Sequence, residues 1–148
     1  MSRSLSIREH ELLDFLLDVN RPLYGERVTL WKRQIATCRV REIDTPYFLA
    51  VCHDDEVEQS GCGAVTLGRE LIALDQGVPV LIYVVLMKTP THWIVDIFNV
   101  DRLDGEPLTA YPEAGNGLMI MEAGKRVGGA DWRSVYGESD LPPPSKLE

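Results

Sequence analysis

The stretch VPVLIYVVLMK, residues Val78–Lys88, decides the fold of this 148-residue chain. Eight consecutive apolar residues, Val80 to Met87, lie between turn-forming residues at 75–77 and 89–91. The run is too short to cross a bilayer as a helix, and its β-branched residues favour a strand. A continuous apolar run is typical of a strand buried on both faces, so we expect a central strand here.

Further strands are expected on both sides of this run. Trp93–Val100 follows after a short turn, and a strand around Arg69–Leu74 precedes it, so the core is predicted to be antiparallel. Upstream, the alternating segment 35–43 and the segment Tyr47–His53 predict another pair of strands. Pro107–Tyr111 is expected to be a short edge strand, where a proline is tolerated.

The chain opens with a predicted amphipathic helix over Ser6–Asp18. Ser6 and Glu9 have the spacing of a capping box. The helix presents one apolar stripe, which consists of Leu12, Leu13, Leu16 and Leu17. The fold class is therefore α+β, with this N-terminal helix packed on a five- or six-stranded, mainly antiparallel meander sheet.

The chain is expected to form one domain with an extension. Its length is that of one ordinary domain, and its 45% apolar composition provides for a core. We place a single α+β domain at residues 1–112 and a Gly/Pro-rich extension, partly packed on it, at 113–148. Trp132 is expected to pack onto the sheet, and Pro142–Pro144 to form a stiff tail. Residues 23–34 are ambiguous, with Leu30 and Trp31 expected to point inward.

The cysteines indicate a compartment. Cys38, Cys52 and Cys62 are odd in number and lack C-x-x-C spacing, which favours free thiols in a reducing environment. The sequence has neither a recognisable leader nor an apolar run of membrane-spanning length. We therefore expect a cytoplasmic protein with no membrane partner.

The charge is acidic and uneven. The formal net charge is −8. Residues 1–50 carry eight basic and seven acidic side chains, and residues 51–148 carry seven and sixteen, which gives +1 and −9. Such a surface repels nucleic acid and attracts basic proteins, although acidity also serves solubility alone. The densest group is the predicted loop residues Asp54, Asp55, Glu56 and Glu58, which we assign as partner-binding residues.

No motif predicts catalysis, a cofactor or a metal. The adjacent Cys52 and His53 point to opposite faces of a strand, so they do not form a nucleophile–base pair. The three His and three Cys have no ligand spacing, and the glycines match neither a dinucleotide-binding nor a P-loop pattern. We expect no catalytic residue, no cofactor and no metal site.

Asp96 is the best candidate for a functional polar group outside the acidic loop. It is predicted to share a strand face with Ile94 and Phe98, where a carboxylate is costly unless it is paired. His92 and Trp93 precede it, and the three residues are assigned to a candidate pocket. The alternatives are a solvent-facing carboxylate or a structural pair with an arginine.

The N-terminal segment resembles a family of small uncharacterised bacterial domains. Arg3 to Leu13 follows the pattern R-x-L-S/T-x-x-E-x-x-L-L, and Asp104–Leu108 matches a D-G-x-P turn near the end of that family. The resemblance covers about residues 3–112 and implies no established activity. In size and acidity the chain is also similar to immunity proteins that neutralise bacterial toxins.

These observations lead to three hypotheses. The first is a non-enzymatic protein-binding domain, in the form of an immunity protein that occludes the active site of a basic toxin domain. The second is a small-molecule-binding or enzymatic domain with a pocket around Asp96. The third is a structural subunit of a homo-oligomer.

Overall fold

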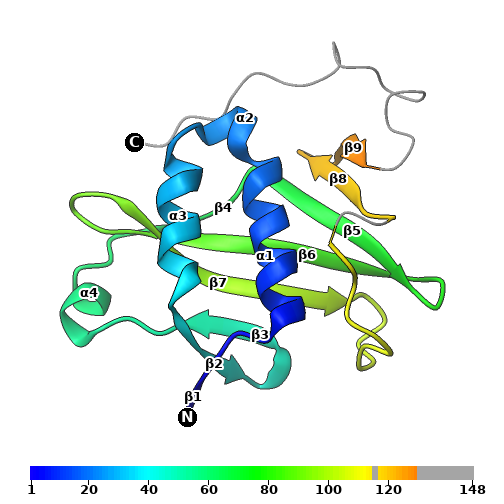
Figure 1. The fold of residues 1–148 in the computed structure, drawn as a ribbon, viewed down its shortest axis with the longest axis horizontal. Coiled ribbons are helices and arrows are strands. Elements are labelled where there is room, and N and C mark those ends of the chain that lie inside the picture. Colours follow the sequence, from blue (N-terminus) through cyan, green and yellow to red (C-terminus); the bar gives the residue numbers. More distant parts are fainter. Residues whose placement is uncertain (115–116, 130–148) are drawn as a thin grey trace.

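The fold is α+β, as expected from the sequence, with helices covering one face of a nine-stranded sheet (Figure 1). The computed structural model describes residues 1–114 and 117–129. Every strand pairing among these residues is antiparallel. The strands follow the order β1-β2-β3-β7-β6-β5-β8-β9, and β4 pairs with β6. In chain order the elements are β1 (Ser2–Ser4), α1 (Ile7–Val19), α2 (Arg21–Tyr24), α3 (Arg27–Ala36), β2 (Arg39–Ile43), β3 (Thr45–Val51), α4 (Asp55–Gln59), β4 (Ala64–Thr66), β5 (Arg69–Asp75), β6 (Val78–Lys88), β7 (Trp93–Arg102), β8 (Met119–Glu122) and β9 (Lys125–Gly129).

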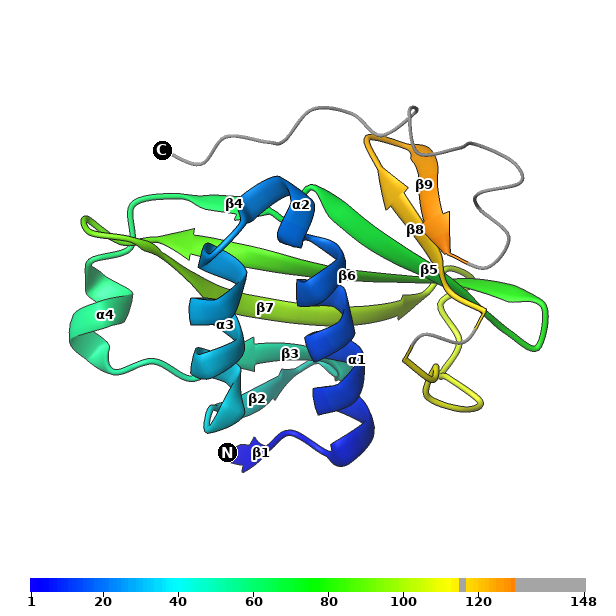
Figure 2. The same ribbon diagram turned by 45° about the horizontal axis from the view of Figure 1, so that its top comes forward.

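Strand β6 is central, as expected, but it is buried on one face only. It pairs with β7 along most of its length and with β5 and β4 on its other edge. Val80, Ile82 and Val84 are completely buried, whereas Leu81 and Tyr83 between them are partly exposed. The prediction of two buried faces was wrong because the helices lie on one side of the sheet (Figure 2).

The N-terminal helix agrees with its prediction. In α1, the Ser6 hydroxyl accepts a hydrogen bond from Glu9 N at 3.1 Å, and Glu9 Oε1 accepts one from Ser6 N at 2.8 Å. This is the expected capping box. The apolar stripe lies fully buried against the sheet and comprises Leu12, Leu13, Leu16 and Leu17.

The segment after α1 differs from its prediction. Helix α3 extends through Ala36, so the strand that was expected to begin at residue 35 begins at Arg39. Trp31 lies inside, with 3% of its surface exposed, and its Nε1 donates to the Trp93 carbonyl at 3.0 Å. Leu30 is 59% exposed, contrary to expectation, because it lies on the outer side of the helix.

The sheet is larger than the predicted meander because distant segments join it. Strand β3 pairs with β7, which adds the first three strands to the edge of the central hairpin. Pro107–Tyr111 is not a strand; the backbone there turns back, and Thr109 N donates to Asp75 Oδ2 at 2.7 Å.

Part of the C-terminal segment belongs to the same sheet. Strand β8 pairs with β5, and β9 pairs with β8. Leu118, just before β8, and Val127 of β9 are buried. Trp132 and Pro142–Pro144, to which the sequence assigned a packed position and a stiff tail, lie outside the described residues. The boundary at residue 112 stays a prediction.

Candidate functional site at the α4 end of the sheet

The acidic segment that was predicted to be a loop is a short helix, α4. Asp54 caps it, because its Oδ1 accepts a hydrogen bond from Val57 N at 2.9 Å. Asp55 and Glu56 then lie in the first turn, where the helix dipole favours negative charge. These interactions explain why so acidic a segment becomes helical.

The carboxylates of α4 face solvent without cationic partners. Asp54, Asp55, Glu56 and Glu58 are all exposed. Across residues 1–114 and 117–129, none of the four takes part in an ion pair. In Figure 1, α4 lies at the end of the sheet, close to the turn that joins β6 to β7.

Asp96 lies at a β-bulge in the neighbouring strand β7. Ile97 is opposite Val85 and Val95 is opposite Leu86, so Asp96 is the extra residue between two regular pairs. The expectation that Asp96 shares a face with Ile94 and Phe98 assumed regular alternation, and the bulge breaks that alternation. The Asp96 side chain is 31% exposed.

His53 is the closest cationic or titratable partner found for Asp96 in the described chain. Its Nε2 lies 3.7 Å from Asp96 Oδ1, beyond hydrogen-bond distance. The His53 side chain is only 7% exposed, and Nε2 has no hydrogen-bond partner. Burial raises the pKa of Asp96; the charge of His53 acts in the opposite direction, and that of Glu58 adds to the rise. Glu58 of α4 therefore acts on the ionisation of Asp96.

A cavity of about 390 Å³ lies beside this pair. Its lining combines apolar groups with polar groups from four parts of the chain. They include Gln34, His53, Glu56, Val57, His92 and Ile94. The cavity thus brings His53 and the α4 residue Glu56 to the walls of one space.

The residues assigned to the Asp96 pocket do not converge on one cavity. His92 lines the cavity beside His53, and its Nδ1 lies 2.7 Å from Thr91 Oγ1. His92 and Trp93 together line a neighbouring cavity of about 430 Å³, and Asp96 lines neither cavity. His92, Trp93 and Asp96 nevertheless lie at the same end of the sheet as the acidic residues of α4. The sequence analysis had treated the two sets of residues as separate candidate sites.

His53 is the residue of this site that the sequence did not reveal. It was weighed only as a neighbour of Cys52. Its place beside Asp96 depends on the pairing of β3 with β7, over a separation of more than forty positions. That long-range pairing leaves no local pattern in the sequence.

The described part of the chain contains no group of three or more His, Cys, Asp or Glu side chains that could hold a metal ion. Within the same residues, no helix has the length and apolarity to cross a membrane. Comparisons with protein-family models, with curated proteins and with solved structures give no match. The resemblance at the N-terminus stays a prediction.

Proposed function

We propose that this protein is a non-enzymatic binding domain whose α4 end engages a basic surface of a protein partner. The specific form we favour is an immunity protein that occludes the active site of a bacterial toxin. The observation that carries the proposal is the group of four exposed, unpaired carboxylates on α4 and its N-cap, next to a cavity that Glu56 and Val57 help to line.

The lack of pairing on α4 supports a role in binding. Elsewhere in the described chain, several carboxylates are held by arginines or lysines, for example Glu9 by Arg3 at 2.7 Å and Asp18 by Lys32 at 2.9 Å. Charges that are already paired contribute little to attracting a partner. Unpaired charges of one sign on one face speed the encounter with an oppositely charged surface.

The cavity supplies what charge alone does not. Tight interfaces depend on a few side chains inserted into desolvated pockets, with near-neutral contacts around them. The lining of this cavity suits a Lys or Arg side chain from a partner. Val57 and Ile94 would pack against its aliphatic stem, and the Glu56 carboxylate would pair with its charged end.

The toxin interpretation follows from the charge required of the partner. Enzymes that cleave nucleic acid line their active sites with basic side chains, because the substrate carries a phosphate at every nucleotide. An acidic protein surface that covers such a site competes with the substrate for the same charges. The predicted likeness to small acidic immunity proteins points in the same direction.

The test is affinity capture from extracts of the cells that encode the protein, with three baits compared. The first bait is the wild type. The second carries Asp55→Lys, Glu56→Lys and Glu58→Lys, which leaves the capping Asp54 in place. The third carries Glu11→Lys, Glu26→Lys and Glu106→Lys, which gives the same change in net charge on other exposed sites. Each capture is made at low and at high salt.

We expect one stoichiometric partner on the wild type and on the third bait, weakened by salt, and its loss from the α4 variant. The captured protein should then be inhibited by stoichiometric wild type in its own assay. Equal capture by all three baits would show that α4 does not form the interface.

A further inference from the structure

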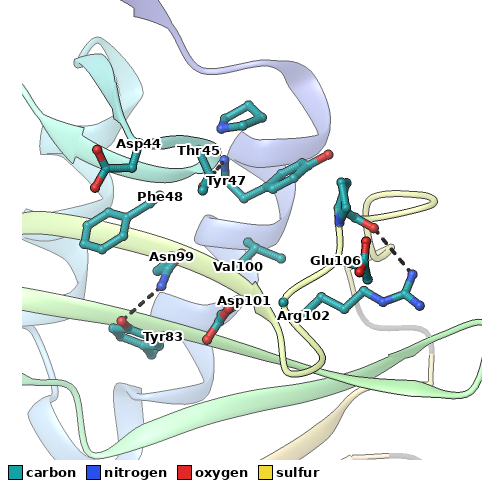
Figure 3. Close-up of a pocket in the computed structure, with 13 residues that line it drawn as sticks. Asp44, Thr45, Tyr47, Phe48, Tyr83, Asn99, Val100, Asp101, Arg102 and Glu106 are labelled. Carbon is teal, nitrogen blue, oxygen red and sulfur yellow. Dashed lines mark hydrogen bonds between the residues drawn. The ribbon is translucent and has the colours of Figure 1, made fainter.

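The face of the sheet that the helices leave open carries a separate, larger pocket of about 580 Å³ (Figure 3). Three of its lining residues form a row across neighbouring strands: Phe48 of β3 is opposite Asn99 of β7, and Asn99 is opposite Tyr83 of β6. The volume is within the range of small-molecule sites. None of these residues belongs to the α4 site.

Asn99 and Tyr83 form a hydrogen-bonded polar pair in this row. Asn99 is only 8% exposed, and its Nδ2 donates to the Tyr83 hydroxyl oxygen at 3.0 Å (Figure 3). In the described chain, neither side chain makes another hydrogen bond. The side-chain oxygen of Asn99, Oδ1, can therefore accept a hydrogen bond from a ligand, and the Tyr83 hydroxyl can donate one. If the Asn99 amide is turned over, the pair still offers one donor and one acceptor side by side.

The charges around the pocket select against anions. Asp44, Asp101 and Glu106 line it, and none of them takes part in an ion pair in the part of the chain described. Arg102 also lines the pocket, but its guanidinium is already ion-paired. Its Nε lies 3.0 Å from Asp104 Oδ1, and its Nη1 lies 3.1 Å from Asp75 Oδ2. A phosphate or carboxylate would meet three carboxylates and no free guanidinium.

We propose that this pocket binds a flat, uncharged or cationic heteroaromatic molecule that has a carbonyl next to a ring N–H, the edge found in nucleobases and nucleosides. The ring C=O accepts from the Tyr83 hydroxyl, and the adjacent N–H donates to the Asn99 carbonyl oxygen. The aromatic ring of Phe48 gives the flat molecule a stacking surface. Asp101 accepts hydrogen bonds from sugar hydroxyl groups at the rim.

This site goes beyond protein binding at α4 and does not depend on it. The unpaired carboxylates exclude nucleotides and nucleic acid chains as occupants, because each carries phosphate. The matching of donor to acceptor decides which edge of a base is recognised, since a site built to pair with a polar group rejects an analogue that lacks it.

The test is isothermal titration calorimetry of the full chain with uridine and inosine as probes. Each probe has two controls: the analogue methylated on the ring nitrogen of that edge, and the monophosphate of the same nucleoside. The protein variants are Tyr83→Phe, which removes one hydroxyl, and Phe48→Leu, which removes one aromatic surface. Tyr111→Phe serves as the matched control because its hydroxyl lies outside this pocket.

We expect at least one unmodified nucleoside to bind at concentrations below the millimolar range, and both of its modified forms to bind at least about tenfold more weakly. Tyr83→Phe should weaken binding about tenfold, the effect of one lost hydrogen bond. Phe48→Leu should also weaken it, whereas Tyr111→Phe should leave it unchanged. No binding of either nucleoside at millimolar concentration would overturn the proposal, as would equal affinity for the methylated or phosphorylated forms.

Discussion

The carboxylates around the N-terminal helix and those of α4 are the same chemical groups in opposite situations. Glu9 receives two hydrogen bonds from Arg3, at 2.7 and 2.8 Å, and a third from Ser6 N. Glu122 is 7% exposed and pairs with an equally buried Arg69 at 2.8 Å. The α4 carboxylates are exposed and have no ion pair among the described residues.

The difference separates charge that stabilises the fold from charge that is free for another role. A buried carboxylate persists only when its hydrogen-bonding capacity is satisfied, so the partners of Glu9 and Glu122 are structural requirements. An exposed carboxylate has no such requirement. Asp55, Glu56 and Glu58 should therefore be expendable for folding, whereas Asp54 also caps the helix, and the following changes test that division.

The largest effect is expected at the buried pair. Glu122→Leu leaves the Arg69 guanidinium buried without its carboxylate, and should lower the free energy of unfolding by about 3–5 kcal/mol. Denaturant unfolding measures the change. The double variant Arg69→Leu with Glu122→Leu should recover much of the loss, because no unpaired charge remains; a double variant as unstable as the sum of both single changes would contradict this account.

A smaller loss is expected at Glu9. Burial alone would raise the pKa of Glu9, but the hydrogen bonds from Arg3 and Ser6 outweigh burial and lower it. A lowered pKa in the folded state stabilises the protein above the pKa of the unfolded chain, and this contribution is lost as pH falls through the folded value. Glu9→Gln should therefore cost about 1–3 kcal/mol at neutral pH.

The pH dependence provides the control for Glu9. Unfolding curves of wild type and Glu9→Gln should converge as the solution is acidified below about pH 4, where the unfolded-state carboxyl is protonated. A stability difference that is constant from neutral to acidic pH would show that the ionised form of Glu9 is not what Arg3 stabilises.

Asp96 is expected to behave in the opposite way. Its pKa is raised, chiefly by burial. A raised carboxyl pKa favours the folded state at low pH, and that contribution is lost as pH rises through the folded value. Asp96→Asn should therefore raise stability at neutral pH by less than about 1 kcal/mol, since the group is partly exposed. A clear loss of stability would instead indicate a structural pair with His53.

The smallest effect on stability is expected at α4. Asp55→Asn, Glu56→Gln and Glu58→Gln together should change the free energy of unfolding by about 0.5 kcal/mol or less, because exposed residues outside special contacts contribute little. Thermal unfolding followed by circular dichroism measures this. The contrasting variant is Asp54→Ala, which removes the helix cap and should cost more, about 1 kcal/mol.

The sequence predicted local elements well because they depend on local signals. The capping box of Ser6 and Glu9, the leucine stripe of α1 and the β6–β7 hairpin each follow from residues close together in the chain. It did not predict that β6 has one open face. An apolar run does not distinguish a strand covered on one face from a strand covered on both. In β6, Leu81 and Tyr83 belong to the apolar run although they lie on the partly exposed face.

The candidate sites depended on long-range pairing, which the sequence does not encode in a local pattern. The acidic residues of α4 were visible as composition, but their proximity to Asp96 was not. The Asn99–Tyr83 pair was also missed, although an asparagine inside the apolar strand Trp93–Val100 was a signal. Interpreting it requires the register of β7 against both β3 and β6.

The central claim is that the α4 carboxylates attract a basic partner rather than serve solubility. The most direct test is the association rate of the captured partner with immobilised wild type and with the variant Asp55→Asn, Glu56→Gln, Glu58→Gln, measured over a range of salt concentrations. We predict an association rate at least about tenfold lower for the variant at low salt, with a flatter salt dependence and a folded, equally stable protein. Identical association rates and identical salt dependence for the two proteins would contradict the claim.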